Sequence, residues 1–131
     1  MKKLEHDLLT STYTEVYHED EGDERFNAPN HFFVVKSGSD PKDIEHRHIY
    51  SGGLLSGIHF QEGPIKEESI NGVYNEDLIA MVITRLEHFQ KSEFACRDNA
   101  IAITKLEEAM LWMRKRTMAR EKRGVVGTHT K

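Results

Sequence analysis

The chain has 131 residues, of which 37% are hydrophobic and 31% are charged, and its formal net charge is −4 at pH 7. This length fits one domain over residues 1–131, and the composition is that of a polar but foldable protein, not of a disordered chain. The sequence lacks an apolar run of the ~18–20 residues that a membrane span needs, and acidic residues follow Met1 too closely for a signal peptide. The single cysteine, Cys96, excludes an internal disulfide and a zinc site built from cysteines. We therefore expect a soluble, intracellular protein.

The charge is unevenly distributed along the chain. From Arg114 to Lys131 there are seven basic residues and one acid, Glu121, which together give this segment a charge of +6. The residues before Arg114 therefore carry −10. The net charge thus conceals an acidic body and a basic C-terminal end.

Residues 1–30 form the least regular part of the sequence. The run from His18 to Glu24 is acidic and contains a glycine, and residues 27–30 add further turn formers. Because like charges repel and turn formers interrupt regular structure, we predict an acidic loop here. The preceding stretch, from Leu4 to Tyr17, fits either a strand or a short helix.

Residues 31–74 have the pattern of an antiparallel sheet. The segment His31–Lys36 is rich in aromatic and β-branched residues, and residues 46–50 and 54–61 are further candidate strands, each followed by a glycine-containing turn. The Asn-Gly pair at 71–72 lies between apolar residues, which is a typical hairpin-turn signal. We therefore predict several short strands joined by tight turns.

The hydrophobic period then changes from two to about 3.6 residues, which indicates helices. Asn75 is the predicted N-cap of a first helix over residues 76–90, and a second helix begins near Cys96 and meets no glycine or proline before Gly124. A connection this short between two amphipathic helices implies an antiparallel hairpin. The apolar stripes consist of Leu78, Ile79, Val82, Ile83, Leu86 and Phe89 in the first helix, and of Ala102, Ile103, Leu106, Ala109, Met110 and Met113 in the second.

These elements define the predicted fold class, which is α+β. An N-terminal antiparallel β-sheet over residues 31–74 is followed by a C-terminal antiparallel two-helix hairpin over residues 75–123. The basic residues extend the second helix, and we predict a flexible tail at 124–131.

Few side chains suggest catalysis or metal binding. His46 and His48 would share one face of a strand, with His59 as a third candidate ligand, but no carboxylate at a supporting spacing accompanies them. We therefore expect ordinary strand histidines, and neither a metal nor another cofactor. Cys96 with a histidine base could form a nucleophile, but a capping role at the turn is the better interpretation. Because no catalytic group can be assigned, we predict that the protein is not an enzyme.

The basic helix end has two functional interpretations and one structural one. Its cations could bind the phosphates of a nucleic acid or those of a small anionic ligand. Cations are also favoured at the C-terminus of a helix without any ligand. The acidic body would repel a long polyanion, whereas a small phosphorylated ligand is compatible with a local positive pocket.

Phe89, Asn99 and Arg116 form a more specific candidate set. An aromatic ring stacks on a base, an amide reads a hydrogen-bonding edge, and a guanidinium binds phosphate through two hydrogen bonds. Phe89 and Asn99 flank the predicted turn, but Arg116 lies roughly 25 Å further along the same helix at 1.5 Å per residue. If all three contact one small nucleotide, Arg116 must come from a second subunit, which predicts a homodimer with two equivalent sites. The alternative places Phe89 in the core, Asn99 at a cap and Arg116 in solvent.

The same stretch resembles the helical hairpin shared by two phage protein families. These are the first-described Thoeris anti-defence proteins and the anti-CBASS cyclic-nucleotide sponges. A sheet before the hairpin and the terminal segment from Gly124 to His129 are closer to the Thoeris anti-defence family. The resemblance covers about residues 57–130, and its motifs are Glu76-Asp77-Leu78-Ile79, His88-Phe89-Gln90, Phe94-Ala95-Cys96-Arg97-Asp98-Asn99-Ala100, Thr104-Lys105-Leu106-Glu107-Glu108-Ala109 with Trp112, and Arg116-Thr117.

The resemblance implies a sponge that acts in the cytoplasm of the host bacterium. Members of the Thoeris anti-defence family bind a cyclic ADP-ribose isomer, glycocyclic ADP-ribose, made by the TIR enzyme of Thoeris immunity, and hold it without cleaving it. By this resemblance Phe89 would stack on the adenine, Asn99 would bond the ligand, and Arg116 of a neighbouring subunit would hold a phosphate. An N-terminal arginine also contributes in the family, and Arg47 is the candidate here.

The resemblance also implies a larger assembly and further ligands. Members form hexamers, and some bind cyclic di- or trinucleotides at separate sites, for which Arg97 matches a basic residue of the anti-CBASS relatives. Neither DNA, RNA nor a membrane is an expected partner. Two alternatives stay open: a nucleic-acid-binding phage protein that uses the basic helix end, and a hydrolase of the signal nucleotide.

Overall fold

The computed structural model of the protein describes residues 1–19, 29–42 and 53–131. The candidate strand at 46–50 and most of the acidic loop lie outside these ranges. Contacts cluster in two compact units, residues 1–62 and residues 63–131, whereas the length alone favoured a single domain. Each unit is described by itself below.

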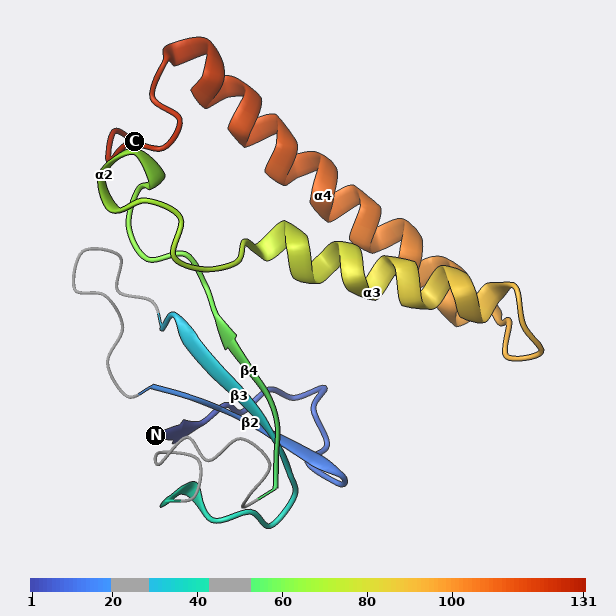
Figure 1. Ribbon diagram of the computed structural model, residues 1–131. Helices are drawn as coiled ribbons and strands as arrows, with labels where there is room; N and C mark the ends of the chain where they lie inside the picture. The colour runs from blue at the N-terminus through green and yellow to red at the C-terminus, as the bar shows by residue number, and fades with distance from the viewer. Residues whose placement is uncertain (20–28, 43–52) are drawn as a thin grey trace. The chain divides into compact units, whose positions relative to one another are not determined.

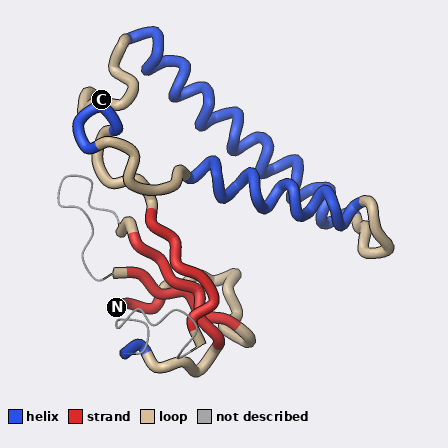
Figure 2. Tube along the Cα trace, viewed as in Figure 1, coloured by secondary structure: helices blue, strands red, loops and turns tan. Residues whose placement is uncertain are grey.

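The first unit is a four-stranded antiparallel sheet with the strand order β1-β2-β3-β4 (Figures 1 and 2). Its strands are β1 (Lys2–Lys3), β2 (Thr14–His18), β3 (His31–Lys36) and β4 (Leu54–His59). The antiparallel sheet and the strand at His31–Lys36 are therefore confirmed, and β4 confirms most of the predicted strand at 54–61. For Leu4–Tyr17 the sequence fitted either a strand or a short helix, and the structure has a strand, β2, at the C-terminal end of this stretch.

The core of the sheet lies on one of its faces. Among the described residues, Tyr17 and Val35 are the buried hydrophobic ones, and Phe33 is one of the partly buried residues that pack against them. Alternate residues of a strand point to the same face, so His31 shares the face of Phe33 and Val35. His59 lies directly opposite His31 on β4. The strand register thus places two histidines side by side at the margin of a small core.

The predicted hairpin turn at 71–72 is wrong. Residues Ile65–Glu68 form the short helix α2, and the next helix begins at Asn75. The Asn-Gly pair therefore joins two helices, and too few residues remain on either side of it to form the two strands of a hairpin.

The second unit contains two long helices, α3 (Asn75–Gln90) and α4 (Arg97–Arg123). They contact each other near the connecting turn and diverge away from it (Figure 1). Asn75 is not the N-cap as predicted, because Tyr74 precedes the first helical turn and its backbone N–H donates to Oδ2 of Asp77 at 2.9 Å. The helical hairpin and its approximate bounds are confirmed.

Local signals mark both ends of α4. Cys96 is the N-cap, and its Sγ accepts a hydrogen bond from the backbone N–H of Asn99 at 3.5 Å. The helix ends at Gly124, which has a φ of 69°. This left-handed conformation suits glycine because it strains the backbone of residues that carry a side chain, even though a Cβ at this position would have no other atom within 4 Å. The predicted capping role of Cys96 is therefore confirmed.

The turn between the helices is closed by one side chain that the periodicity does not reveal. The Gln90 amide donates from Nε2 to the carbonyl oxygen of Cys96 at 2.9 Å, and its Oε1 accepts from the Cys96 backbone N–H at 3.0 Å. A single amide thus joins the last residue of α3 to the N-cap of α4.

The hairpin leaves its apolar surface largely uncovered. No residue of α3 or α4, all of which the structure describes, is buried. Met81 is 62% exposed, and Leu111 and Trp112 are 69% and 67% exposed. Two helices can cover only one side of each other, so the predicted stripes do not form a closed core within this unit. The described part of the chain contains no helix with the length and apolar character to cross a membrane.

The Gln90 contact predicts the effect of a substitution at the turn. Gln90→Ala removes both hydrogen bonds to Cys96, each of which typically contributes about 0.5–1.5 kcal/mol. We expect faster amide hydrogen exchange at Cys96 and a lower melting temperature, measured by mass spectrometry and circular dichroism. Glu87→Ala, an exposed position on the same helix, is the control and should leave both values near those of the wild type. Equal exchange at Cys96 in both variants would contradict the role of Gln90.

Candidate functional site

The turn end of the hairpin brings together two of the residues singled out in the sequence. Phe89 is half-buried in the last turn of α3, and Asn99 is half-buried in the first turn of α4. Arg97, the first residue of α4, is exposed at the same end. A ring, an amide and a guanidinium are therefore available near this turn.

Arg85 is a residue of this end that the sequence analysis missed. Its guanidinium carbon lies 5.0 Å from the centroid of the Phe89 ring, a separation typical of a cation–π contact. The signal was present in the sequence, because residues four apart on a helix are neighbours. Arg85 adds a second positive charge beside the aromatic ring.

The structure does not bring Arg116 to this end within one chain. Asn99 and Arg116 both belong to the continuous helix α4, which places their backbones roughly 25 Å apart at 1.5 Å per residue. A small ligand that contacts Phe89 and Asn99 cannot reach Arg116 of the same chain. The last predicted ligand residue, Arg47, lies outside the described residues.

The basic residues around Arg116 are occupied by contacts within the chain. Arg114 forms an ion pair with Glu121 at 3.0 Å, and the Lys115 ammonium lies 4.7 Å from the centroid of the Trp112 ring. Arg116 itself is exposed, and its side chain forms neither a hydrogen bond nor an ion pair with any residue that the structure describes. The guanidinium of Arg116 is therefore available to an external anion.

Arg120 holds the C-terminal segment. Its guanidinium donates to the carbonyl oxygens of Val125, Thr128 and Thr130 at 3.0, 3.1 and 2.6 Å. The segment also contacts α2, where the Lys66 backbone N–H donates to the Gly127 carbonyl at 3.0 Å and His129 pairs with Glu67. The expected flexible tail thus has defined contacts, and α2 and the chain end lie side by side (Figure 1).

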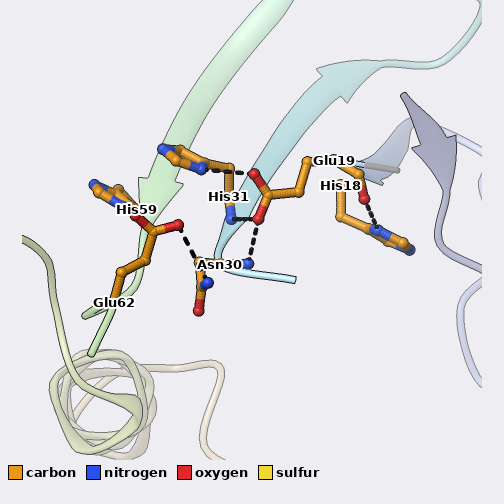
Figure 3. Close-up of polar contacts among 6 residues, drawn as sticks. All are labelled: His18, Glu19, Asn30, His31, His59 and Glu62. Atoms are coloured by element: carbon orange, nitrogen blue, oxygen red, sulfur yellow. Dashed lines mark hydrogen bonds and ion pairs between the residues drawn. The ribbon is translucent and has the colours of Figure 1, made fainter. Parts of the chain in front are cut away.

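A second polar cluster lies at one end of the sheet in the first unit (Figure 3). The rings of His31 and His59 stack with their centroids 3.9 Å apart and an interplanar angle of 8°. Nε2 of His59 lies 3.4 Å from Oε2 of Glu62. Nδ1 of His31 lies 2.9 Å from Oε2 of Glu19, and Asn30 Nδ2 donates to Oε1 of Glu62 at 3.2 Å.

Glu19 is the anionic anchor of this cluster. Burial by itself would raise the pKa of its carboxyl group, but hydrogen bonds from the Asn30 backbone and from the His31 ring and backbone lower that pKa below its usual value. The Asn30 and His31 backbone N–H groups both donate to Oε1 of Glu19, at 2.6 and 3.2 Å. Glu19 therefore stays ionised at neutral pH and orients Asn30 and His31, which is the first residue of β3.

Three side chains of the cluster have the types and spacing of metal ligands. One nitrogen each of His31 and His59 and one oxygen of Glu62 lie within 4.8 Å of one another, and all three residues are half-buried. The sequence analysis named His59 but missed His31 and Glu62, because the pairing of β3 with β4 brings the two histidines together. His46 and His48, the other histidines considered, lie outside the described residues.

Comparisons with known proteins match both parts of the chain. A family model described as "Acb2/Tad1, hairpin domain" matches residues 57–118, a stretch that includes Phe89, Asn99 and Arg116. Over its full length the chain is 52% identical to Thoeris anti-defense 1 from Bacillus phage SBSphiJ7. That alignment extends over 142 residues and covers 100% of both proteins.

The contacts of Arg120 predict a structural role distinct from ligand binding. Arg120→Ala removes three hydrogen bonds to tail carbonyls. We expect faster hydrogen exchange and faster carboxypeptidase release at residues 125–131. Lys122→Ala removes one charge from an exposed position nearby and serves as the control. If both variants release the tail at the wild-type rate, Arg120 does not hold it.

Proposed function

The chain belongs to the Thoeris anti-defense 1 family of phage proteins, and from this premise we propose that it acts as a sponge for a cyclic nucleotide signal. It is a phage anti-defence protein. In the proposed activity it binds a cyclic ADP-ribose isomer, glycocyclic ADP-ribose, inside the infected bacterium. It holds this product of the Thoeris TIR enzyme without cleaving it, so the defence effector receives no signal.

The observation that carries the proposal is that the Arg116 guanidinium is exposed and has no side-chain partner among the described residues. Its neighbours Arg114, Lys115 and Arg120 are engaged within the chain, whereas Arg116 is exposed and pairs with no residue in the described ranges. A guanidinium binds a phosphate through two parallel hydrogen bonds. Arg123 is also exposed and has no side-chain partner in the described ranges, and the family resemblance is what assigns the diphosphate of the ligand to Arg116 in this proposal.

The proposed site is completed by a second copy of the chain. Phe89 would stack on the adenine and Asn99 would bond the ligand at the turn of one subunit, while Arg116 would come from an antiparallel neighbour. A two-fold contact of this kind creates two equivalent sites. The exposed apolar side chains of α3 and α4 supply the surface that such a contact would cover. Assembly of these dimers into hexamers follows from the family resemblance.

The chemistry of the proposed contacts fits binding without turnover. The site side chains are an aromatic ring, an amide and a guanidinium, none of which serves as a nucleophile or general base at neutral pH. Stacking, phosphate pairing and exclusion of water are sufficient for tight binding. Arg97 is the candidate for a separate cyclic di- or trinucleotide site, and Arg47 for the N-terminal contribution to the first site.

A recovery experiment separates the sponge from the hydrolase. The protein is incubated with glycocyclic ADP-ribose, then denatured, and the released nucleotide is analysed by liquid chromatography. Intact ligand supports the sponge, and its conversion to a linear product would establish a hydrolase. A nucleic-acid binder is recognised by the steep loss of its DNA affinity with salt.

Arg116→Ala should weaken the binding of glycocyclic ADP-ribose by at least about tenfold, because a charge-assisted phosphate contact is typically worth ~1.5–3 kcal/mol. The measurement is isothermal titration calorimetry, with sedimentation to verify an unchanged oligomer. Arg123→Ala removes the same charge from the same helix and is the matched control, with affinity near the wild-type value. Equal affinities in the two variants would refute the assignment of Arg116.

Mixing two defective variants tests whether the site lies between subunits. Phe89→Ala and Arg116→Ala each disrupt every site in their homodimers. In a mixed dimer, one site receives both intact residues and the other receives neither, so about one site in four should recover after random reassembly. Stoichiometry is measured by calorimetry after the mixture is unfolded and refolded together. Absence of recovery, with dimers present, would place the whole site within one chain.

A further inference from the structure

We propose that the end of the sheet formed by β3 and β4 binds a zinc ion through His31, His59 and Glu62. This site lies in the first unit, whereas the proposed nucleotide residues Phe89, Asn99 and Arg116 lie in the second. The inference therefore goes beyond the proposed function and does not depend on it.

The backbone brings two of the ligands together. His31 begins β3, His59 ends β4, and the two are direct partners in the antiparallel register. Directly opposite residues project from the same face of a sheet with their Cβ atoms about 5 Å apart. The stacked rings, 3.9 Å apart, show that both side chains extend in the same direction. Glu62, three residues after His59, contributes its carboxylate to the same place (Figure 3).

The separation of His59 and Glu62 matches two ligands of one ion. Nε2 of His59 is buried and has no hydrogen-bond partner among the residues that the structure describes, yet it lies 3.4 Å from Oε2 of Glu62. Two ligand atoms each about 2.1 Å from a tetrahedral zinc ion are about 3.4 Å apart. A zinc ion between them would use the lone pair of this nitrogen, and His31, the third member of the 4.8 Å cluster, would complete the three protein ligands.

The surrounding residues provide the outer contacts that metal ligands require. The Glu19 carboxylate accepts a hydrogen bond from Nδ1 of His31 at 2.9 Å, which leaves the lone pair of the His31 ring on Nε2. A carboxylate that orients a histidine through its second nitrogen is a recurrent feature of zinc sites. Asn30 plays the same part for Glu62, since its Nδ2 donates to Oε1 at 3.2 Å and Oε2 faces His59.

The set of two histidines and one glutamate favours zinc over magnesium or calcium, which prefer oxygen ligands. Three protein ligands leave a fourth position for water. Because Tyr17 and Val35 are the buried hydrophobic residues of the described sheet, the ion would act as a structural crosslink. It would join β3 to β4 where the apolar core is small.

The test measures zinc bound to the full chain. The protein is stripped with a chelator, dialysed against Zn²⁺, separated from free metal by gel filtration, and analysed by elemental mass spectrometry. We expect one zinc per chain and a higher melting temperature, because a ligand that binds only the folded state stabilises it. Retention of no zinc by the folded wild-type chain would overturn the proposal.

Three variants locate the ion. His59→Ala should abolish retention, and Glu62→Gln, whose Oε1 can still accept from Asn30, should weaken zinc affinity by at least tenfold. Glu19→Gln, in the outer shell, should weaken it by about 10–100-fold. Circular dichroism verifies that each variant is folded, and Glu62→Gln and Glu19→Gln keep the test decisive if His59→Ala fails to fold.

The matched control is His129→Ala. His129 also pairs with a glutamate, Glu67, but this pair belongs to no three-ligand group among the described residues. It should retain zinc at the wild-type stoichiometry and affinity. Equal zinc affinity in His129→Ala, Glu62→Gln and Glu19→Gln would mean that zinc binds elsewhere, and the assignment to the sheet would then be wrong.

Discussion

A hairpin of two helices has a single mutual interface, and this constraint governs the second unit. The stripe on α3 and the stripe on α4 each exceed what the partner helix can cover, so no residue of either helix is buried. The unbroken length of α4 also keeps Asn99 and Arg116 roughly 25 Å apart. Both facts lead to the same proposal, which is that a second copy covers the apolar surface and completes the ligand site.

Two side chains restrict how the hairpin can move at its ends. Gln90 joins the end of α3 to the N-cap of α4, and Arg120 binds three carbonyl groups of the chain end. Three of the seven basic residues of the C-terminal segment, Arg114, Lys115 and Arg120, have contacts within the chain, whereas the guanidinium groups of Arg116 and Arg123 are exposed and available to an anion.

The sheet unit combines a small apolar core with a cluster of polar side chains at one end of the sheet. Its buried hydrophobic residues are few in the described ranges, and its polar cluster is correspondingly well organised. Glu19, Asn30, His31, His59 and Glu62 come from the ends of three neighbouring strands and from the residues beside them. Polar groups that are partly withdrawn from water need partners. Carboxylates supply them for His31 and Asn30, whereas Nε2 of His59 has no hydrogen-bond partner among the described residues. The same arrangement places one nitrogen each of His31 and His59 and one oxygen of Glu62 within 4.8 Å of one another, where a metal ion would crosslink β3 and β4.

The sequence by itself determined the α+β class, the strand at His31–Lys36 and the approximate bounds of both long helices. These depend on periodicity and on end signals such as Gly124, which act over a few residues. Phe89, Asn99 and Arg116 were selected by side-chain chemistry and resemblance, and their roles stay proposals. Only the tertiary structure decided that 71–72 joins helices, that Arg120 binds the tail, and that His31 lies against His59. Each of these depends on contacts between segments that are distant in the sequence. Strand register and the paths of the loops determine such contacts, and local sequence patterns do not encode them.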